Sequence, residues 1–298
     1  MGWRLHLTNQ TIHRLHILPG KTPLLAAWLG RSRVYFINPE NGVQMGDQTL
    51  DEARAASWAD PAWQEFLAGL VAPNKAILPQ ISTRFGELYL SGDGRTQLYQ
   101  QGGQLTLVAA GQESEFTTEA ARFAAVGFDR ILSFVAALDN SGCLHLFQQA
   151  TAPGVFNIGL NPHAEFSYSI AIAQGGGSIF ASDGQQVVLV DSAGQVRQRF
   201  HAHYPVSRME CSSNGRLLVT CDVETNVLRL YNGTNLKPTH QRHAEDLMAS
   251  ATQVQLIADP PPAQVAVSAL ALSNKGMLAF ALAGVICASD MDELTALP

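Results

Sequence analysis

The stretch that decides the fold is Val206–Pro238, which reads VSRMECSSNGRLLVTCDVETNVLRLYNGTNLKP. Three short apolar runs, at residues 206–212, 216–221 and 227–231, are separated by polar turns. The first turn contains an Asn-Gly pair, a strong hairpin signal because both central residues of a two-residue turn need positive φ. The stretch therefore predicts three antiparallel strands joined by tight turns.

Looser copies of this unit recur along the chain. They cover residues 12–37, 81–108, 122–147, 168–190 and 267–289. An aspartate returns at the second turn of four units, at steps of about 40 to 46 residues, a period typical of propeller blades with four strands each. These aspartates are Asp93, Asp139, Asp183 and Asp222.

The repeats predict an all-β fold, a β-propeller of four-stranded antiparallel blades, with about six blades and seven as the alternative. Runs such as ILSFVAAL are almost continuously apolar, which indicates strands covered on both faces rather than a two-layer sandwich. We expect residues 1–298 to form one propeller domain. The N-terminal WRLHLTN is expected to pair into the last blade and to close the ring, which would remove two bare strand edges.

Two segments interrupt the repeat. An Asp-Pro pair at 60–61 suits a helix start, so we predict a helical insertion over residues 51–74. The aromatic residues Trp58, Trp63 and Phe66 either pack on the rim or stay exposed and anchor a partner. The second segment, residues 239–264, is expected to be an outer strand followed by a long loop, since three consecutive prolines cannot lie in a central strand.

Composition narrows the functional classes. The formal net charge is −6 and no long basic run is present, which argues against nucleic acid as a partner. No run of ~18 apolar residues predicts a membrane-spanning helix, and membrane insertion is not expected. The N-terminus shows no secretory signal pattern, so a cytoplasmic location is expected.

The four cysteines match no zinc signature. A two-residue hairpin loop would place Cys211 opposite Leu218 and Cys221 opposite Arg208, so these two cysteines should not be cross-linked. We expect all four to be reduced and to pack as small apolar residues.

Candidate chemistry is sparse. His201 and His203 would share one side of a strand and could share a metal, but the following Tyr-Pro favours a connection between blades. The repeated turn aspartates suggest either calcium ligands or ordinary turn residues, and turn chemistry is favoured because the repetition follows the fold. No nucleophile motif occurs, so no catalytic residue, metal or cofactor is expected.

The segment from residue 201 to 238 resembles a WD40 repeat. His203 stands near the Gly-His of that family, and Asn214-Gly215 matches its first hairpin. Tyr231 and Asn232 stand where the family has Trp-Asp. The resemblance implies a WD40-like propeller and a rigid platform for protein partners, usually without catalysis.

These observations predict a non-catalytic scaffold for protein–protein interaction or an assembly subunit. Its partners are expected to be other proteins, bound through the aromatic insertion and through His163, His203 and Arg208 near the blade connections. The alternative is a propeller enzyme or small-ligand binder that uses the central channel. The sequence leaves the partners and the oligomeric state open.

Overall fold

The structure is a computed structural model. It describes residues 2–8, 10–18, 24–29, 33–49, 78–83, 86–90, 96–101, 104–109, 112–117, 123–129, 134–148, 154–162, 168–256, 266–282, 284–290 and 295–296. The predicted helical insertion at 51–74, with Trp58, Trp63 and Phe66, lies outside the described residues. His163 lies outside them as well.

The described strands form six sheets of four or five strands, and the expected all-β class is confirmed. Sheet I contains β2 (Ile12–Leu18), β3 (Leu24–Leu29), β4 (Arg33–Ile37) and β5 (Gln44–Thr49). Sheet II contains β6 (Leu78–Thr83), β7 (Gly86–Leu90), β8 (Thr96–Gln101), β9 (Gln104–Ala109) and β10 (Gln112–Thr117). Sheet III contains β11 (Phe123–Phe128), β12 (Phe134–Asp139), β13 (Cys143–Gln148) and β14 (Gly154–Asn157).

The second half of the chain supplies the other three sheets. Sheet IV contains β15 (Ser169–Ile172), β16 (Ile179–Ser182), β17 (Gln186–Val190) and β18 (Val196–His201). Sheet V contains β19 (Val206–Cys211), β20 (Leu217–Asp222), β21 (Val227–Asn232), β22 (Pro238–His243) and β27 (Thr295–Ala296). Sheet VI contains β24 (Val267–Leu272), β25 (Leu278–Leu282), β26 (Val285–Ser289), β1 (Trp3–His6) and β23 (Gln253–Leu256).

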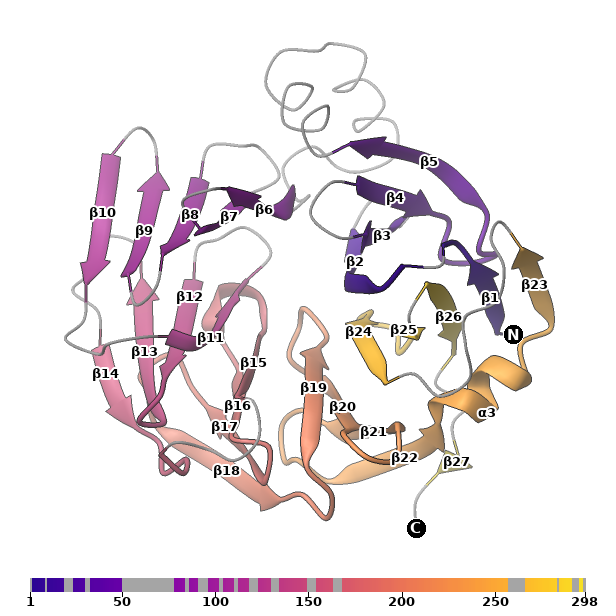
Figure 1. The fold of residues 1–298 in the computed structure, drawn as a ribbon. Coiled ribbons are helices and arrows are strands. Elements are labelled where there is room, and N and C mark those ends of the chain that lie inside the picture. Colours follow the sequence, from indigo (N-terminus) through magenta and orange to yellow (C-terminus); the bar gives the residue numbers. More distant parts are fainter. Residues whose placement is uncertain are drawn as a thin grey trace.

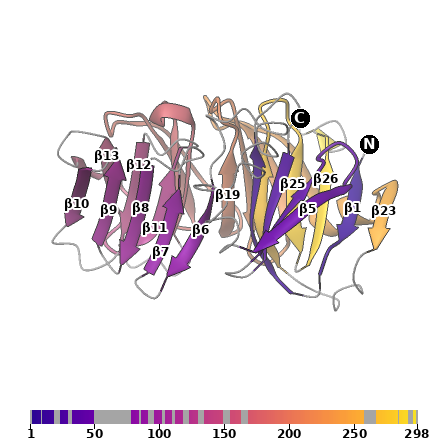
Figure 2. The same cartoon turned by 90° about the horizontal axis from the view of Figure 1, so that it is seen from above.

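The sheets are arranged around a shared centre, with the first strand of each sheet facing inward (Figure 1). The inner strands contact one another in succession, β11 with β15, β15 with β19, β19 with β24 and β24 with β2. Seen from above, the strands run between the two faces of a flat molecule (Figure 2). Loops that join neighbouring strands therefore gather on these two faces.

Apolar side chains fill the spaces between neighbouring sheets. One buried cluster joins sheets I and VI, and others join sheets V and VI, sheets III and IV, and sheets IV and V. Strands β12 and β25 are buried along their whole length. The continuous apolar runs of the sequence are thus explained, because both faces of these strands are covered by protein.

The hairpin of β19 and β20 has the predicted register, with Cys211 opposite Leu218 and Arg208 opposite Cys221. The predicted turn type is wrong, because among the described residues of this turn only Gly215 has positive φ. The turn spans more residues than expected, and the Ser212 N–H donates to the Leu217 carbonyl at its base. The Asn214 side-chain oxygen accepts the N–H of Arg216 within this turn.

The N-terminal strand joins the last sheet, as predicted. β1 pairs antiparallel with β26, with Trp3 opposite Ala288. The Trp3 side chain is buried, and its Nε1–H donates to the Pro39 carbonyl at 2.7 Å. The N-terminal strand is therefore tied to β26, a strand near the other end of the chain, and sheet I is held against sheet VI.

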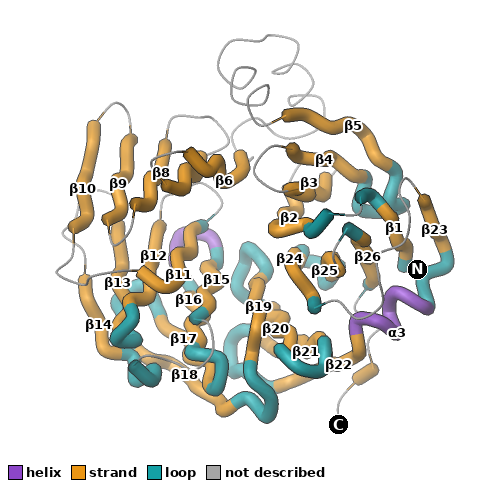
Figure 3. The backbone as a smooth tube through the Cα atoms, in the orientation of Figure 1, coloured by secondary structure: helices purple, strands orange, loops and turns teal. Residues whose placement is uncertain are grey.

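The segment after β21 corrects part of the sequence interpretation. The outer strand β22 is confirmed, but the expected long loop instead begins with helix α3 (Ala244–Ala249) and β23 (Figure 3). Ala244 and Leu247 are buried against the cluster between sheets V and VI, so packing stabilises a helix of six residues. β23 then pairs in parallel with β1. Among the described residues no helix is long and apolar enough to cross a membrane.

Candidate functional site

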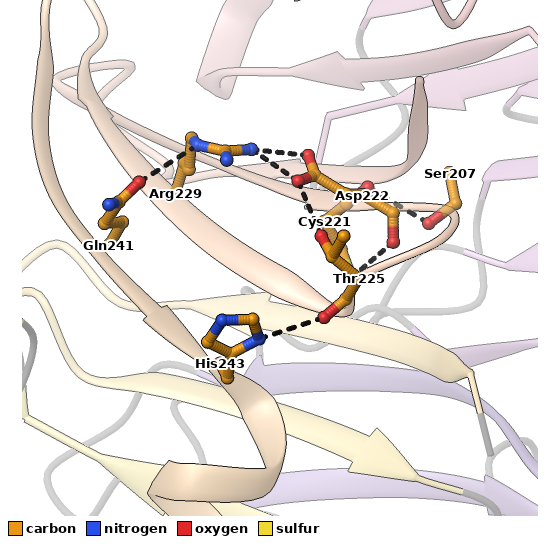
Figure 4. A network of polar contacts seen from close by, with 7 residues as sticks. All are labelled: Ser207, Cys221, Asp222, Thr225, Arg229, Gln241 and His243. Atoms are coloured by element: carbon orange, nitrogen blue, oxygen red, sulfur yellow. Dashed lines mark hydrogen bonds and ion pairs between the residues drawn. The ribbon is translucent and has the colours of Figure 1, made fainter. Parts of the chain in front are cut away.

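The turn between β20 and β21 is organised by a buried carboxylate. Asp222 ends β20 with 1% of its surface exposed. The Arg229 guanidinium on β21 donates from Nη1 to both carboxylate oxygens, and the Thr225 hydroxyl donates to Oδ2 at 3.0 Å (Figure 4). A buried ion pair of this kind is stable only with good geometry and further hydrogen bonds, and Asp222 has both.

The pair extends outward to the last strand of the sheet. Arg229 Nε donates to the Gln241 side-chain oxygen at 3.2 Å, and the guanidinium carbon lies 5.9 Å from the centre of the Tyr204 ring. Within the described chain, His243 Nδ1 lies 3.1 Å from the Thr225 carbonyl oxygen (Figure 4). The contacts with Asp222, Gln241 and Tyr204 hold the Arg229 side chain in one orientation.

These side chains line an open groove of about 420 Å³ on the outer part of sheet V, which we call the rim groove. Its wall combines side chains from the β18–β19 connection, β21, β22 and α3. Its lining includes Tyr204, Arg229, Gln241, Arg242, His243 and Asp246. Tyrosine and arginine are enriched at protein interfaces, and a groove of mixed charge suits an extended peptide more than a compact apolar ligand.

A second cavity, of about 300 Å³, lies at the shared centre and is called the axial cavity below. The inner strands of five sheets contribute to its wall. Their representatives are Leu15, Val126, Ser169, Arg208 and Ser268. Ser169 Oγ is buried, and no described group hydrogen-bonds with it.

The structure separates the two predicted partner-binding residues that it describes. His203 is exposed beside the rim groove, where its ring meets the Tyr204 ring edge-on at 4.6 Å between centroids. Arg208 lies on β19 in the axial cavity, and its Nε–H donates to the Ser268 carbonyl at 3.3 Å. The two residues therefore belong to different sites.

Sequence analysis missed most of the rim groove. Tyr204 and Arg242 are 38 positions apart in the sequence, and no motif links them. One local signal was present, because Arg229 stands inside an otherwise apolar strand, VLRLY. A charged residue at such a position requires a buried partner, which here is Asp222.

Asp139 and Asp183 act as turn residues, as predicted, whereas Asp222 binds side chains and Asp93 lies outside the described residues. Asp139 Oδ1 accepts the backbone N–H groups of Ser141 and Cys143, and Asp183 Oδ1 accepts those of Gln185 and Gln186. Each carboxylate thus satisfies the turn that follows its own strand. Within the described parts of the chain, no group of three or more His, Cys, Asp or Glu is placed to hold a metal ion.

Ionisation of these aspartates follows from their hydrogen bonds. Burial opposes the charged form of Asp139, but hydrogen bonds from His145, Ser141 and Cys143 outweigh it and lower the pKa of that carboxyl. The same balance lowers the pKa of Asp183. Both carboxyls are therefore held in the charged form by the fold.

All four cysteines are free, as expected. Cys211, Cys221 and Cys287 are buried, and Cys143 is partly exposed. Burial raises the pKa of Cys221 to about 12, which leaves its thiol protonated. These buried cysteines behave as small apolar residues of the core.

Comparison with known proteins assigns no family. No protein-family profile matches the chain, and no curated protein matches its sequence.

Proposed function

We propose that this protein is a non-catalytic, WD40-like β-propeller that binds other proteins as a scaffold or assembly subunit. In this proposal the six sheets are the blades. Their arrangement around a shared centre, the successive contacts of their inner strands and the entry of β1 into the last sheet support it. Stacked blades provide a rigid surface that is complete before any partner arrives.

The rim groove is the observation that supports the binding of other proteins. Its central cation, Arg229, is fixed by Asp222 and Gln241, so little side-chain entropy is lost when a partner binds beside it. Tyr204 and Arg242 add an aromatic ring and a second guanidinium to the same groove. Preorganised Tyr and Arg side chains are the usual anchors of a protein interface.

The test is capture of partners from the native source by tagged protein, with quantitative mass spectrometry. Tyr204→Ala and Arg242→Glu are compared with Lys275→Glu, which makes the same charge change on an exposed turn of sheet VI. We expect a defined set of proteins to be captured at least tenfold less by both groove variants and equally by the control. Equal capture by all variants, in protein with an unchanged thermal melt, would contradict the proposal.

The axial cavity favours one second candidate, a binder of small polar ligands. The buried Ser169 hydroxyl and the Arg208 guanidinium both lie in its wall. A thermal-shift screen with small polar metabolites distinguishes the candidates. Stabilisation that Arg208→Met abolishes and Arg242→Glu preserves would move the function from the rim to the axis.

A further inference from the structure

The outermost strands of sheets IV and V carry positive charge in an acidic protein. β18 reads VRQRFH and β22 reads PTHQRH, and neither contains an Asp or a Glu. The whole chain has 25 acidic residues against 19 Lys and Arg. The two strands follow each other along the outside of the molecule (Figure 1).

The outer edge of β22 already accepts an added strand. β27 pairs with it in antiparallel orientation, with Ala296 opposite His240 and Thr295 opposite Gln241. This pairing covers two of the six residues of β22. An outer strand edge presents backbone N–H and C=O groups that another extended chain can pair with.

The basic side chains of β22 indicate which side chains an added strand would carry. His240 and Arg242 are two positions apart and therefore lie on the same side of the strand. Lys237, which is exposed, precedes them. Acidic side chains at alternate positions of an added strand would meet this row of basic residues.

β18 has two arginines and one histidine, and β22 has one arginine and two histidines, but β18 is the less favourable edge for an added strand. Arg197 forms an ion pair with Asp191, and the Arg199 guanidinium donates to the Ile158 carbonyl at 3.3 Å. Among the described strands, an added strand is observed on β22 and not on β18.

We propose that the outer edge of β22 binds an extended, acidic segment of a partner protein as an added antiparallel strand, in competition with β27. This inference rests on the proposed function and names its partner class. Backbone pairing supplies affinity, and the row formed by His240 and Arg242 supplies preference for acidic residues. The sequence before β27 contains Asp290, Asp292 and Glu293, and it has the acidic composition that the edge of β22 should prefer.

The experiment measures binding of a fluorescent peptide, SDMDELTALP, by anisotropy. The protein is used at full length and as a variant that ends at Asp290 and so lacks β27. We expect the shortened protein to bind the peptide at least tenfold more tightly than the full chain, because its edge is vacant. Equal binding by the two proteins would overturn the competition.

Three controls separate strand pairing from simple charge attraction. Arg242→Glu, and Arg242→Ala as a milder second variant, should weaken binding at least tenfold and severalfold respectively, while Lys275→Glu should not. A peptide with proline in place of Thr295 and Leu297 keeps its charge but cannot complete a ladder, and we expect it to fail. Equal binding of that peptide, or full displacement by a short DNA duplex at the same charge concentration, would show a site that reads charge alone.

The outcomes also separate this inference from the proposed function. If partner capture depends on Tyr204 and Arg242 but the peptide does not bind, only strand addition is wrong. If the peptide binds but capture is unaffected by the groove variants, the protein-scaffold proposal fails at this site. Dimerisation of the full chain that the peptide reverses would replace the partner protein with a second copy and overturn the assignment.

Discussion

β12 and β20 each end in an aspartate at the same point of their sheets, yet the two carboxylates bind different partners. Asp139 is held by its own turn and by His145 Nε2 at 2.8 Å. Asp222 instead binds Arg229, which reaches the rim groove. The difference comes from one position on the third strand, since His145 lies opposite Ala137 and Arg229 lies opposite Thr220, each two residues before the aspartate.

A turn aspartate that recurs in two sheets can thus support a binding surface in one of them. In sheet III the ring of His145 packs against Phe123, with 5.2 Å between ring centroids, and both residues are buried. In sheet V the longer side chain of Arg229 pairs with the turn carboxylate of Asp222 and places its guanidinium beside the Tyr204 ring. A histidine at this position of the third strand gives a buried internal contact, whereas an arginine gives a fixed guanidinium at the rim groove.

The largest expected effect is removal of the third-strand partner in sheet V. Arg229→Met leaves the buried Asp222 carboxylate with one described hydroxyl donor and should cost about 3–5 kcal/mol in the free energy of unfolding. His145→Leu should cost only about 1 kcal/mol, because Asp139 keeps three hydrogen bonds from its own turn. Urea unfolding at pH 7 measures both.

A double variant controls the interpretation of that result. Arg229→Met combined with Asp222→Leu removes both charges, and it should recover much of the loss because a buried ion pair can be replaced by apolar side chains at little cost. Equal destabilisation by Arg229→Met and His145→Leu would show that the two turns do not differ as described.

Acidification should lower the free energy of unfolding through Asp139 in sheet III and Asp183 in sheet IV. Both have a lowered pKa in the folded protein, so the unfolded chain takes up protons first, near ~3.9, as the pH falls. Below that pH the unfolded state binds more protons, and stability is lost as the pH falls through the folded pKa values. A pKa that is lower by one in the folded protein than in the unfolded chain adds about 1.4 kcal/mol to the free energy of unfolding at neutral pH.

The measurement is the urea midpoint between pH 7 and pH 2.5. A variant with Asp139→Asn and Asp183→Asn should be less stable at pH 7 and should lose less stability on acidification than the natural protein. Parallel pH curves for the two proteins would show that these carboxyls do not supply the acid sensitivity.

The smallest effect concerns the cysteines that flank the two turns. Cys221, just before Asp222, is buried with its pKa raised to about 12, whereas Cys143, just after the Asp139 turn, is partly exposed. In native protein a thiol reagent such as DTNB should modify Cys143 first and Cys221 only on unfolding. Peptide mapping identifies the modified sites, and rapid native labelling of Cys221 would contradict the burial of this turn.

Much of the local structure could be predicted from the sequence. Alternation of short apolar runs with Asn-Gly and Asp-Gly turns placed the strands, and residue counting gave the register between Cys211 and Leu218. The role of Asp139 and Asp183 was also predictable, because a turn aspartate binds backbone groups two to four positions away. The unpaired N-terminal run correctly indicated that β1 completes the last sheet.

The rim groove and the edge of β22 were decided only by the tertiary structure. Tyr204, Arg229 and Arg242 meet because the β18–β19 connection folds against β21 and β22 of sheet V, and no residue pattern links these positions in the sequence. Helix α3 replaces the expected loop because Ala244 and Leu247 find a buried surface on sheets distant in the chain. Turn hydrogen bonds and strand periodicity act over a few residues and can be read in sequence, whereas a surface built from segments distant in the chain depends on how those segments pack.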